Sequence, residues 1–465
     1  MASLTDDELA LVFSTLTHWS FGRVAQTCKQ WHRIAARQEL LGRFEAQIAL
    51  TRFAFGLREP LSLATGCTGS YINCMTIDED QGRLITCTDS DDLSVWQLSP
   101  DGGVQLLTTW RSAFRSIVGC EVCGDKLVLT GVGGGLVAHA SDLYRTISPL
   151  KRPRLVQPLR LTCHSHFSCA LNAPRQNMTG LAVRADLDRI FACCWAGGVH
   201  EFELSSGALL HTVYSMSCAY TLVVHERMIY VGGSLYAFEQ DDAQSDSDDS
   251  DSNATRCCND VDLGVVAVLY IRADGEAPME WVDPANSTFG RYEYDLISPC
   301  ESVRDEHALM EQLPPTAPKF GTTLHFASGR FVAALMMHDG FLYSGDGLPS
   351  VSMWAVQHHH GVPSFLHELP NPKLPDGMND TRSFVTDLAV GNGLLFATYG
   401  GRIGNPACFS AWNLNVAPGA APEHVLHVTT ADSASLHACH VHNGCLFTGG
   451  SGHHKPGVLR VWKLS

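Results

Sequence analysis

The sequence lacks any apolar run long enough to cross a membrane. Its longest runs, such as residues 265–271, have the length of a single strand. The first eight residues include Asp6, Asp7 and Glu8, where a secretory signal would be basic. We therefore expect no membrane association, and a protein of the cytoplasm, the nucleus or both.

Basic residues are scarce as well. The chain has 32 Lys and Arg against 48 Asp and Glu, which gives a formal net charge of -16. A protein with this charge repels phosphate-rich surfaces. The composition argues against nonspecific binding to nucleic acid or to anionic lipid.

The motifs of common catalytic sites are also missing. The chain has no Gly-x-Ser-x-Gly, no His-Glu-x-x-His, no phosphate-binding loop and no dinucleotide fingerprint. Its 17 cysteines show no paired Cys-x-x-Cys spacing, and most occur in strand-like segments. In a reducing compartment such cysteines are small buried hydrophobes. We expect no catalytic residues, no cofactor and no metal.

What the sequence does contain is a repeat. Residues 84–98 alternate with a period of two on both sides of a polar Asp-Ser-Asp-Asp turn, which predicts two short strands. Related segments occur at 127–139, 190–202, 342–354, 395–412 and 446–462, and a seventh is split between 228–233 and 264–275. Most are flanked by further apolar stretches. Seven copies predict seven four-stranded blades, with a two-sheet β sandwich as the alternative.

Four copies resemble the WD-repeat β-propeller family. The dipeptides that carry the resemblance end in Trp, near the end of the third strand of a blade: Val95-Trp96, Met353-Trp354, Ala411-Trp412 and Val461-Trp462. The Asp that usually follows this Trp is missing in all four, and no Gly-His pair opens the blades. The resemblance therefore implies a diverged propeller without the buried Asp-His-Ser-Trp hydrogen-bond network. We expect apolar packing to hold the blades instead.

The first 45 residues follow a helical period. Thr5 and Glu8 form a capping box, and Leu4 and Leu9 are spaced as the hydrophobic staple across it. The apolar positions of two predicted helices follow: Leu9, Val12, Phe13 and Leu16, then Val24, Cys28, Trp31 and Ala35. So small a module needs a partner surface to cover it.

Residues 4–16 and 24–35 resemble the opening and the Val-Cys-Lys-x-Trp ending of the F-box. This family docks onto the adaptor subunit of cullin-RING (SCF-type) ubiquitin ligases. The resemblance implies the following adaptor-binding residues: Leu4, Glu8, Leu9, Val12, Phe13, Val24, Cys28 and Trp31. Thr5 stands where the family usually has Pro. The alternative is a small helical cap packed permanently on the propeller.

The expected fold is mainly β, a seven-bladed WD-repeat-like propeller preceded by a small all-α F-box-like module. The module spans 1–45, and a linker with a possible closing strand spans 46–69. Closure from the 44–67 stretch is expected because no residues remain for a fourth strand after Trp462. The propeller spans 70–465, with insertions at 143–178, 234–263 and 283–327. The acidic Ser/Asp run 241–252 is expected to be disordered.

The two resemblances together imply the substrate-recognition subunit of a cullin-RING E3 ubiquitin ligase, itself without catalytic activity. The competing interpretation is a WD-repeat scaffold with no link to a ligase. Arg115, Arg330 and Arg382 each fall just before a predicted innermost strand, at one mouth of the channel. Converging guanidinium groups favour an acidic or phosphorylated peptide. The alternative is three unrelated surface arginines paired with neighbouring acids such as Asp387.

Overall fold

The structure is a computed structural model of the chain. It describes residues 62–64 and 71–464 with gaps at 90–91, 100–101, 112–114, 133, 146–158, 161–164, 168–177, 196, 215, 217, 238–260, 272–322, 327–330, 347–349, 357–362, 370–383, 401–406, 417–419, 431–432 and 453–454. The predicted F-box-like module, with all eight of its predicted adaptor-binding residues, and the acidic run 241–252 lie outside the described residues.

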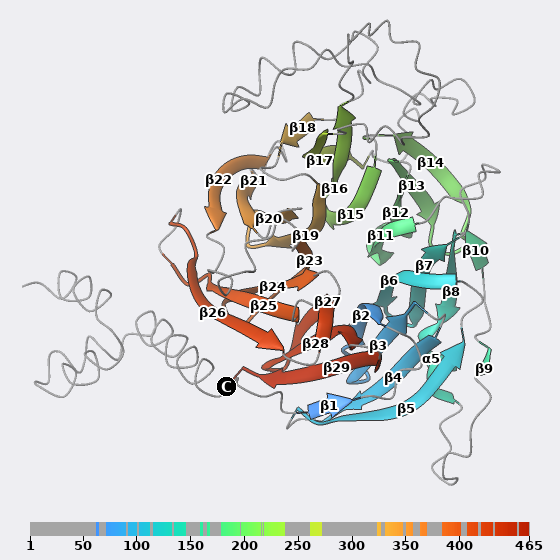
Figure 1. Ribbon diagram of the computed structural model, residues 1–465. Coiled ribbons are helices and arrows are strands. Elements are labelled where there is room, and N and C mark those ends of the chain that lie inside the picture. The colour runs from blue at the N-terminus through green and yellow to red at the C-terminus, as the bar shows by residue number, and fades with distance from the viewer. Residues whose placement is uncertain are drawn as a thin grey trace, which may run out of the picture.

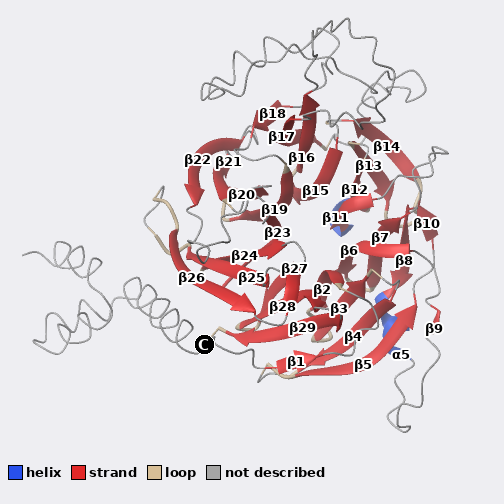
Figure 2. Ribbon diagram, viewed as in Figure 1, coloured by secondary structure: helices blue, strands red, loops and turns tan. Residues whose placement is uncertain are grey.

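Seven sheets form a ring (Figure 1), and nearly all of the described chain is strand or turn (Figure 2). In each blade the first strand is innermost, and the next strands follow outward in antiparallel order. The prediction of a mainly β, seven-bladed propeller is confirmed. We call the end of the ring at which the innermost strands begin the mouth, and the opposite end the far end.

The first three blades have these bounds. Blade 1 contains β2 (Ile72–Asp78), β3 (Arg83–Thr88), β4 (Asp92–Leu98) and β5 (Val104–Arg111), with β9 (Leu159–Arg160) parallel to β5 at its outer edge. Blade 2 contains β6 (Arg115–Cys123), β7 (Lys126–Val132), β8 (Gly134–His139), the short helix α5 (Ala140–Arg145) and β10 (Ser165–Phe167). Blade 3 contains β11 (Met178–Arg184), the 3-10 turn η1 (Ala185–Leu187), β12 (Arg189–Cys194), β13 (Gly198–Glu203) and β14 (Leu209–Tyr214).

The other four blades follow the same order. Blade 4 contains β15 (Cys218–His225), β16 (Met228–Ala237), β17 (Val261–Tyr270) and β18 (Thr323–Phe326). Blade 5 contains β19 (Val332–His338), β20 (Phe341–Asp346), β21 (Val351–Val356) and β22 (Pro363–Leu369). Blade 6 contains β23 (Phe384–Gly391), β24 (Leu394–Gly400), β25 (Ala407–Asn413) and β26 (Glu423–Thr430). Blade 7 contains β27 (Ser433–His442), β28 (Cys445–Gly452), β29 (Lys455–Lys463) and β1 (Ser62–Ala64).

The last blade is completed by the N-terminal strand. β1 pairs antiparallel with β29, with Ser62 opposite Val461 and Ala64 opposite Leu459. This pairing covers the outer edge of β29, which would otherwise expose unpaired backbone groups. The closing strand therefore comes from the stretch in which the sequence analysis expected it.

The boundaries of the insertions differ from those expected. The stretch 143–178 contains β10, the outer strand of blade 2, and 283–327 contains β18, the outer strand of blade 4. In blade 4, β16 and β17 continue their pairing to Ala237 and Val261, so this hairpin extends a few residues into the expected insertion 234–263. Outer strands of two to four residues carry too little periodicity to be seen in the sequence.

The core consists of separate apolar clusters between neighbouring blades. Among the described residues there is one cluster at each of the seven junctions. Each blade sends alternate side chains to the blade before it and the blade after it, as the two faces of a pleated sheet require. The Trp residues of the WD-like repeats pack into these junctions: Trp96, Trp354, Trp412 and Trp462.

The expectation that apolar packing replaces the buried Asp-His-Ser-Trp network is wrong for the last link of that network, because three of the four Trp residues keep a hydroxyl partner. The indole N–H of Trp96 donates to Thr86 Oγ1 at 2.9 Å, and Trp354 and Trp462 make the same bond to Ser344 and Thr448 at 2.9 and 3.0 Å. In each case the acceptor lies two residues beyond the cross-strand partner of the Trp. In blade 6 this position is Ala397. The Trp412 indole accordingly has no hydrogen-bond partner among the described residues.

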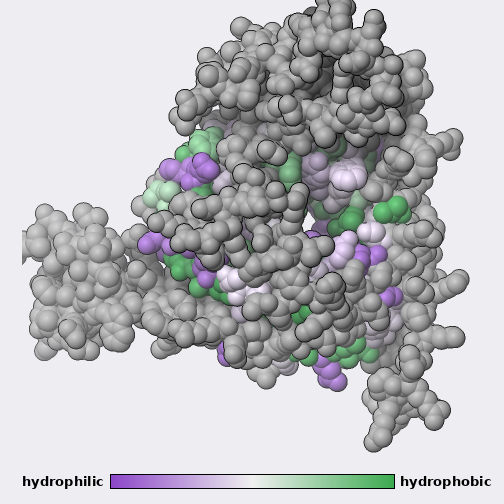
Figure 3. Space-filling model, in the orientation of Figure 1, coloured by the Kyte–Doolittle hydropathy of each residue, from purple (hydrophilic) through white to green (hydrophobic). Residues whose placement is uncertain are grey.

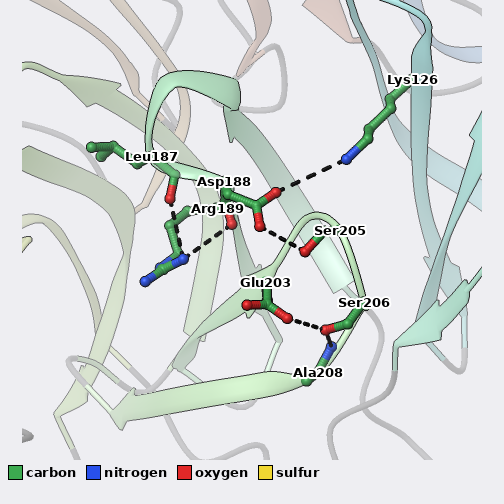
Figure 4. Close-up of polar contacts among 8 residues, drawn as sticks. All are labelled: Lys126, Leu187, Asp188, Arg189, Glu203, Ser205, Ser206 and Ala208. Carbon is green, nitrogen blue, oxygen red and sulfur yellow. Dashed lines mark hydrogen bonds and ion pairs between the residues drawn. The ribbon is translucent and has the colours of Figure 1, made fainter. Parts of the chain in front are cut away.

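Tight turns close the far end. Three hairpins turn through an Asp-Gly or Asn-Gly pair with positive φ at both residues, such as Asn392 (53°) and Gly393 (71°). This geometry matches the twist of the flanking strands. Figure 4 shows a different corner at this end, the one after the 3-10 turn η1: Ser205 donates to Asp188 Oδ2 at 2.7 Å, and Lys126 of blade 2 lies 3.9 Å from Asp188 Oδ1. The polar groups of this corner are thus used within the propeller.

Candidate functional site

All seven innermost strands carry a β-bulge near their start, at the mouth. The pairing with the second strand skips one residue there, for example between Ile72 and Cys74 and between Val385 and Asp387; the other bulged strands are β6, β11, β15, β19 and β27. A bulge bends its strand and redirects the extra side chain. The extra residues therefore face the neighbouring blade or the mouth, not the interior of their own sheet.

Three of these bulge side chains bind the next blade. Asn73 Nδ2 donates to the carbonyl of Ile117 at 2.9 Å, across the junction of blades 1 and 2. Thr179 Oγ1 and Thr386 Oγ1 donate in the same way to the carbonyls of Ala219 and Leu436, both at 2.7 Å. These bonds fix neighbouring inner strands against each other, so the mouth is a preorganised surface.

Three aromatic rings follow one another at the mouth, one from each of the consecutive blades 4, 5 and 6. Tyr220 is the bulge residue of β15, Phe331 directly precedes β19, and Phe384 begins β23. The Tyr220 and Phe331 ring centroids are 5.4 Å apart, and those of Phe331 and Phe384 are 5.5 Å apart. All three residues are partly exposed. We call this set the aromatic row.

Two further aromatic features lie at the same end. Trp195 follows β12 at the end of the blade where β11 begins, and its side chain is exposed to 53%. On the other side of the mouth, Tyr71 packs against His437 with ring centroids 5.0 Å apart. Burial lowers the pKa of His437 to about 4, against the opposing effect of Asp89, so the imidazole is neutral at pH 7.

Carboxylates join two pairs of inner strands deeper in the ring. Glu121 Oε2 accepts the N–H of Val183 at 2.9 Å, and Asp387 Oδ2 accepts the N–H of Cys439 at 2.8 Å. Burial raises the pKa of Glu121 to about 8 and that of Asp387 to about 7, although the N–H donors partly offset it. These acids act as structural acceptors between blades.

The structure describes only part of the predicted arginine site. Arg115 begins the inner strand β6, as expected, but its side chain is outside the described residues. Arg330 and Arg382 lie outside them entirely, next in sequence to the aromatic row. The alternative pairing with Asp387 gains no support, because the Asp387 carboxylate accepts backbone N–H groups of Cys439 and Leu388. The arginine site therefore stays a prediction.

The aromatic row is absent from the predicted site residues, although the sequence carries a signal for two of its rings. Phe331 directly follows Arg330, and Phe384 comes two residues after Arg382. The same positional argument that placed the arginines before the inner strands also applies to these rings. Tyr220 carried no such signal, because its exposure depends on the bulge in β15.

The far end has a hollow of its own, between blades 1 and 2. It has a volume of about 370 Å³ and is lined by acids that include Asp78, Asp80 and Asp125. Two of them are already engaged: the Tyr144 hydroxyl donates to Asp78 Oδ2 at 2.6 Å, and the Ser141 N–H donates to Asp125 Oδ1 at 3.0 Å. We therefore regard the mouth as the better candidate site.

Aromatic faces on a rigid ring suit the binding of a protein segment. They bury apolar side chains at little entropic cost and attract cations through their π faces.

Seen down the ring, green hydrophobic and purple hydrophilic patches alternate on the described surface (Figure 3). Among the described residues, no helix is long and apolar enough to span a membrane. The fold is a seven-bladed propeller, and the mouth is its candidate site for binding a protein segment.

Comparison with known proteins adds the class of the N-terminal segment. Residues 6–44 match the model of the F-box-like family. The propeller is similar to the structure of U3-55K and to the crystal structure of RRP9 WD40 repeats, each with a TM-score of 0.54 and 10% identity. Both alignments cover 87% of this chain, and 99% and 98% of those chains, respectively. No curated protein sequence matches the chain.

The chain thus combines an F-box-like segment with a seven-bladed propeller whose structural neighbours are WD40 repeat proteins. At 10% identity, the likeness to U3-55K and RRP9 shows the fold alone. The function must therefore be argued from the two parts of this chain and from its mouth.

Proposed function

We propose that this protein is a substrate receptor of a cullin-RING ubiquitin ligase, without catalytic activity of its own. The F-box-like segment would bind the adaptor subunit, and the propeller mouth would bind the target. The observation that carries the proposal is the F-box-like match at residues 6–44, directly before a propeller that β1 closes. F-box and WD40 folds typically serve as adaptors or scaffolds.

The mouth supports target binding through its aromatic row. A target segment would place an apolar or aromatic side chain over Tyr220, Phe331 and Phe384, with Trp195 as a further anchor. The target motif would also contain acidic or phosphorylated groups, which would pair with the predicted Arg115, Arg330 and Arg382. We expect a protein of the cytoplasm, the nucleus or both.

The competing function is a WD-repeat scaffold that assembles other proteins without a ligase. The fold is compatible with a scaffold as well as with a receptor, because one fold can serve many functions. The likeness to U3-55K and RRP9 concerns the fold alone and does not decide between the two functions. The two functions differ in one respect: only a receptor captures the ligase adaptor.

The experiment is a binding assay between the purified full chain and the adaptor subunit. The wild type should capture the adaptor at micromolar concentration, and Trp31→Ala should abolish capture. Trp195→Ala is the matched control, since it also removes an indole but lies in the propeller. It should retain the adaptor while weakening capture of the target from cells. If the folded wild type fails to bind the adaptor, the scaffold replaces the receptor.

A further inference from the structure

Three cysteine thiols meet at the junction of blades 1 and 2. Cys74 of β2 and Cys87 of β3 are direct cross-strand partners, and Cys120 comes from β6, the innermost strand of the next blade. Their three sulfur atoms all lie within 4.8 Å of one another. Among the described residues this is the one group of His, Cys, Asp or Glu with the spacing of metal ligands.

The three thiols lie in an apolar cluster between two innermost strands of the ring. Cys87 is fully buried within the apolar cluster that includes Ile85, Ile117 and Leu129. Cys74 and Cys120 are partly exposed, on the innermost strands that line the channel. The cluster therefore offers an ion a water-poor site between two innermost strands.

The sulfur geometry fits a thiolate-bound ion. With the sulfurs at most 4.8 Å apart, the largest equilateral triangle places each sulfur about 2.8 Å from its centre, whereas a metal–thiolate bond is about 2.3 Å long. In such a triangle each sulfur would move by about 0.5 Å, which a small change in side-chain torsion supplies. No rearrangement of the three strands is needed.

The number of ligands selects the ion. No fourth His, Cys, Asp or Glu joins the group among the described residues, whereas structural Zn²⁺ sites use four protein ligands. Soft thiolates prefer Cu(I), which accepts three of them. We propose that Cys74, Cys87 and Cys120 form a three-coordinate site for a soft monovalent metal ion of the Cu(I) class. This proposal is independent of the ligase function.

Binding would displace the thiol protons to solvent and leave three sulfur–metal bonds, with no change in the oxidation state of Cu(I). The bound ion would also connect blades 1 and 2 across their junction. Since an ion that binds only the folded state stabilises it, the loaded protein should unfold at a higher temperature than the metal-free protein.

The test is an anaerobic titration of the full chain with Cu(I) in the presence of a chromophoric Cu(I) chelator. Cys120→Ser should weaken binding at this site at least about 100-fold and remove one equivalent of tightly held Cu(I). Cys74→Ser is the second variant, because it too alters a partly exposed position. Cys408→Ser, a buried thiol of blade 6, is the matched control and should bind like the wild type.

X-ray absorption should show three sulfur neighbours at about 2.3 Å from the copper. Unchanged Cu(I) affinity in both folded Cys120→Ser and Cys74→Ser would overturn the proposal. So would a two-sulfur shell, tighter binding of Zn²⁺ than of Cu(I), or a Cys74–Cys87 disulfide in place of the reduced thiols. Circular dichroism of the metal-free variants establishes that they are folded.

Discussion

The junction of blades 1 and 2 and the junction of blades 6 and 7 share one plan but differ in chemistry. In both, a bulge side chain donates to a carbonyl of the next inner strand: Asn73 to Ile117, and Thr386 to Leu436. The residue after the bulge residue is Cys74 at the junction of blades 1 and 2, and Asp387 at the junction of blades 6 and 7. A thiol cluster and a single carboxylate thus occupy equivalent positions.

The difference shows how two junctions with the same hydrogen bond between inner strands can respond to different changes in solution. Asp387 accepts the N–H of Cys439 at 2.8 Å and that of Leu388 at 2.9 Å, so backbone groups depend on it. In the other junction, the sulfur atoms of three cysteines lie within 4.8 Å of one another. We therefore expect the junction of blades 6 and 7 to respond to pH, and the junction of blades 1 and 2 to respond to thiophilic metal ions.

The largest expected effect comes from removing the carboxylate. Asp387→Ala leaves the N–H groups of Cys439 and Leu388 without their acceptor, and should lower the free energy of unfolding by roughly 2–3 kcal/mol at pH 5. Urea denaturation followed by fluorescence measures it. Asp80→Ala, which changes an exposed acid in the β2–β3 turn, is the control and should change stability by less than about 0.5 kcal/mol. A loss as small as that of the control would mean that Asp387 does not support the junction.

The pH dependence sharpens the same contrast. The folded protein keeps a proton on Asp387 up to about pH 7, whereas the unfolded chain loses it near the ordinary value of 3.8. Between these values the folded state binds more protons, so stability falls as pH rises, by up to about 1.4 kcal/mol per pH unit. Asp387→Asn should flatten this slope between pH 4 and 7. Glu121 should leave a residual slope that extends to about pH 8.

Denaturation of the wild type and Asp387→Asn across this range provides the measurement. Glu121→Gln should remove the part of the slope that persists toward pH 8. Equal slopes in the wild type and the Asp387→Asn protein would show that this carboxylate is not protonated in the fold.

The shared bulge contact should give similar, smaller effects at both junctions. Thr386→Val and Asn73→Ala each remove a donor to the next blade and should cost about 1 kcal/mol. Thermal unfolding of the two variants compares them. Ser364→Ala, whose hydroxyl makes an exposed bond of 3.4 Å, is the control and should behave like the wild type. If only one of the two bulge variants is destabilised, the junctions do not share a plan.

The smallest effect contrasts blade 1 with blade 6. Trp96 has its hydroxyl partner in Thr86, whereas Ala397 occupies that position opposite Trp412. Ala397→Ser should therefore raise stability by about 0.5–1 kcal/mol, and Ser344→Ala in blade 5 should lower it by about 1 kcal/mol. Paired melting curves provide the measurement. A destabilised Ala397→Ser would show that the buried cluster has no room for the hydroxyl.

Much of the fold could be predicted because its signals are local. The period of two in each strand and the constant offset to Trp96 and Trp354 identify the two central strands of a blade. The closing strand followed from the missing fourth strand of blade 7. The outer strands β9, β10 and β18 could not be located, because two to four residues give no period.

The sequence by itself determined the number of blades, the place of the Trp in four of the repeats and the likeness of the N-terminal segment to the F-box, since all three depend on residues close together in the chain. Only the tertiary structure decided which side chains meet between blades. Cys74, Cys87 and Cys120 come together because the ring places β2 against β6, and Tyr220, Phe331 and Phe384 form a row because bulges and strand starts coincide at one end. Such meetings depend on the curvature and closure of the sheet ring, which no local pattern encodes.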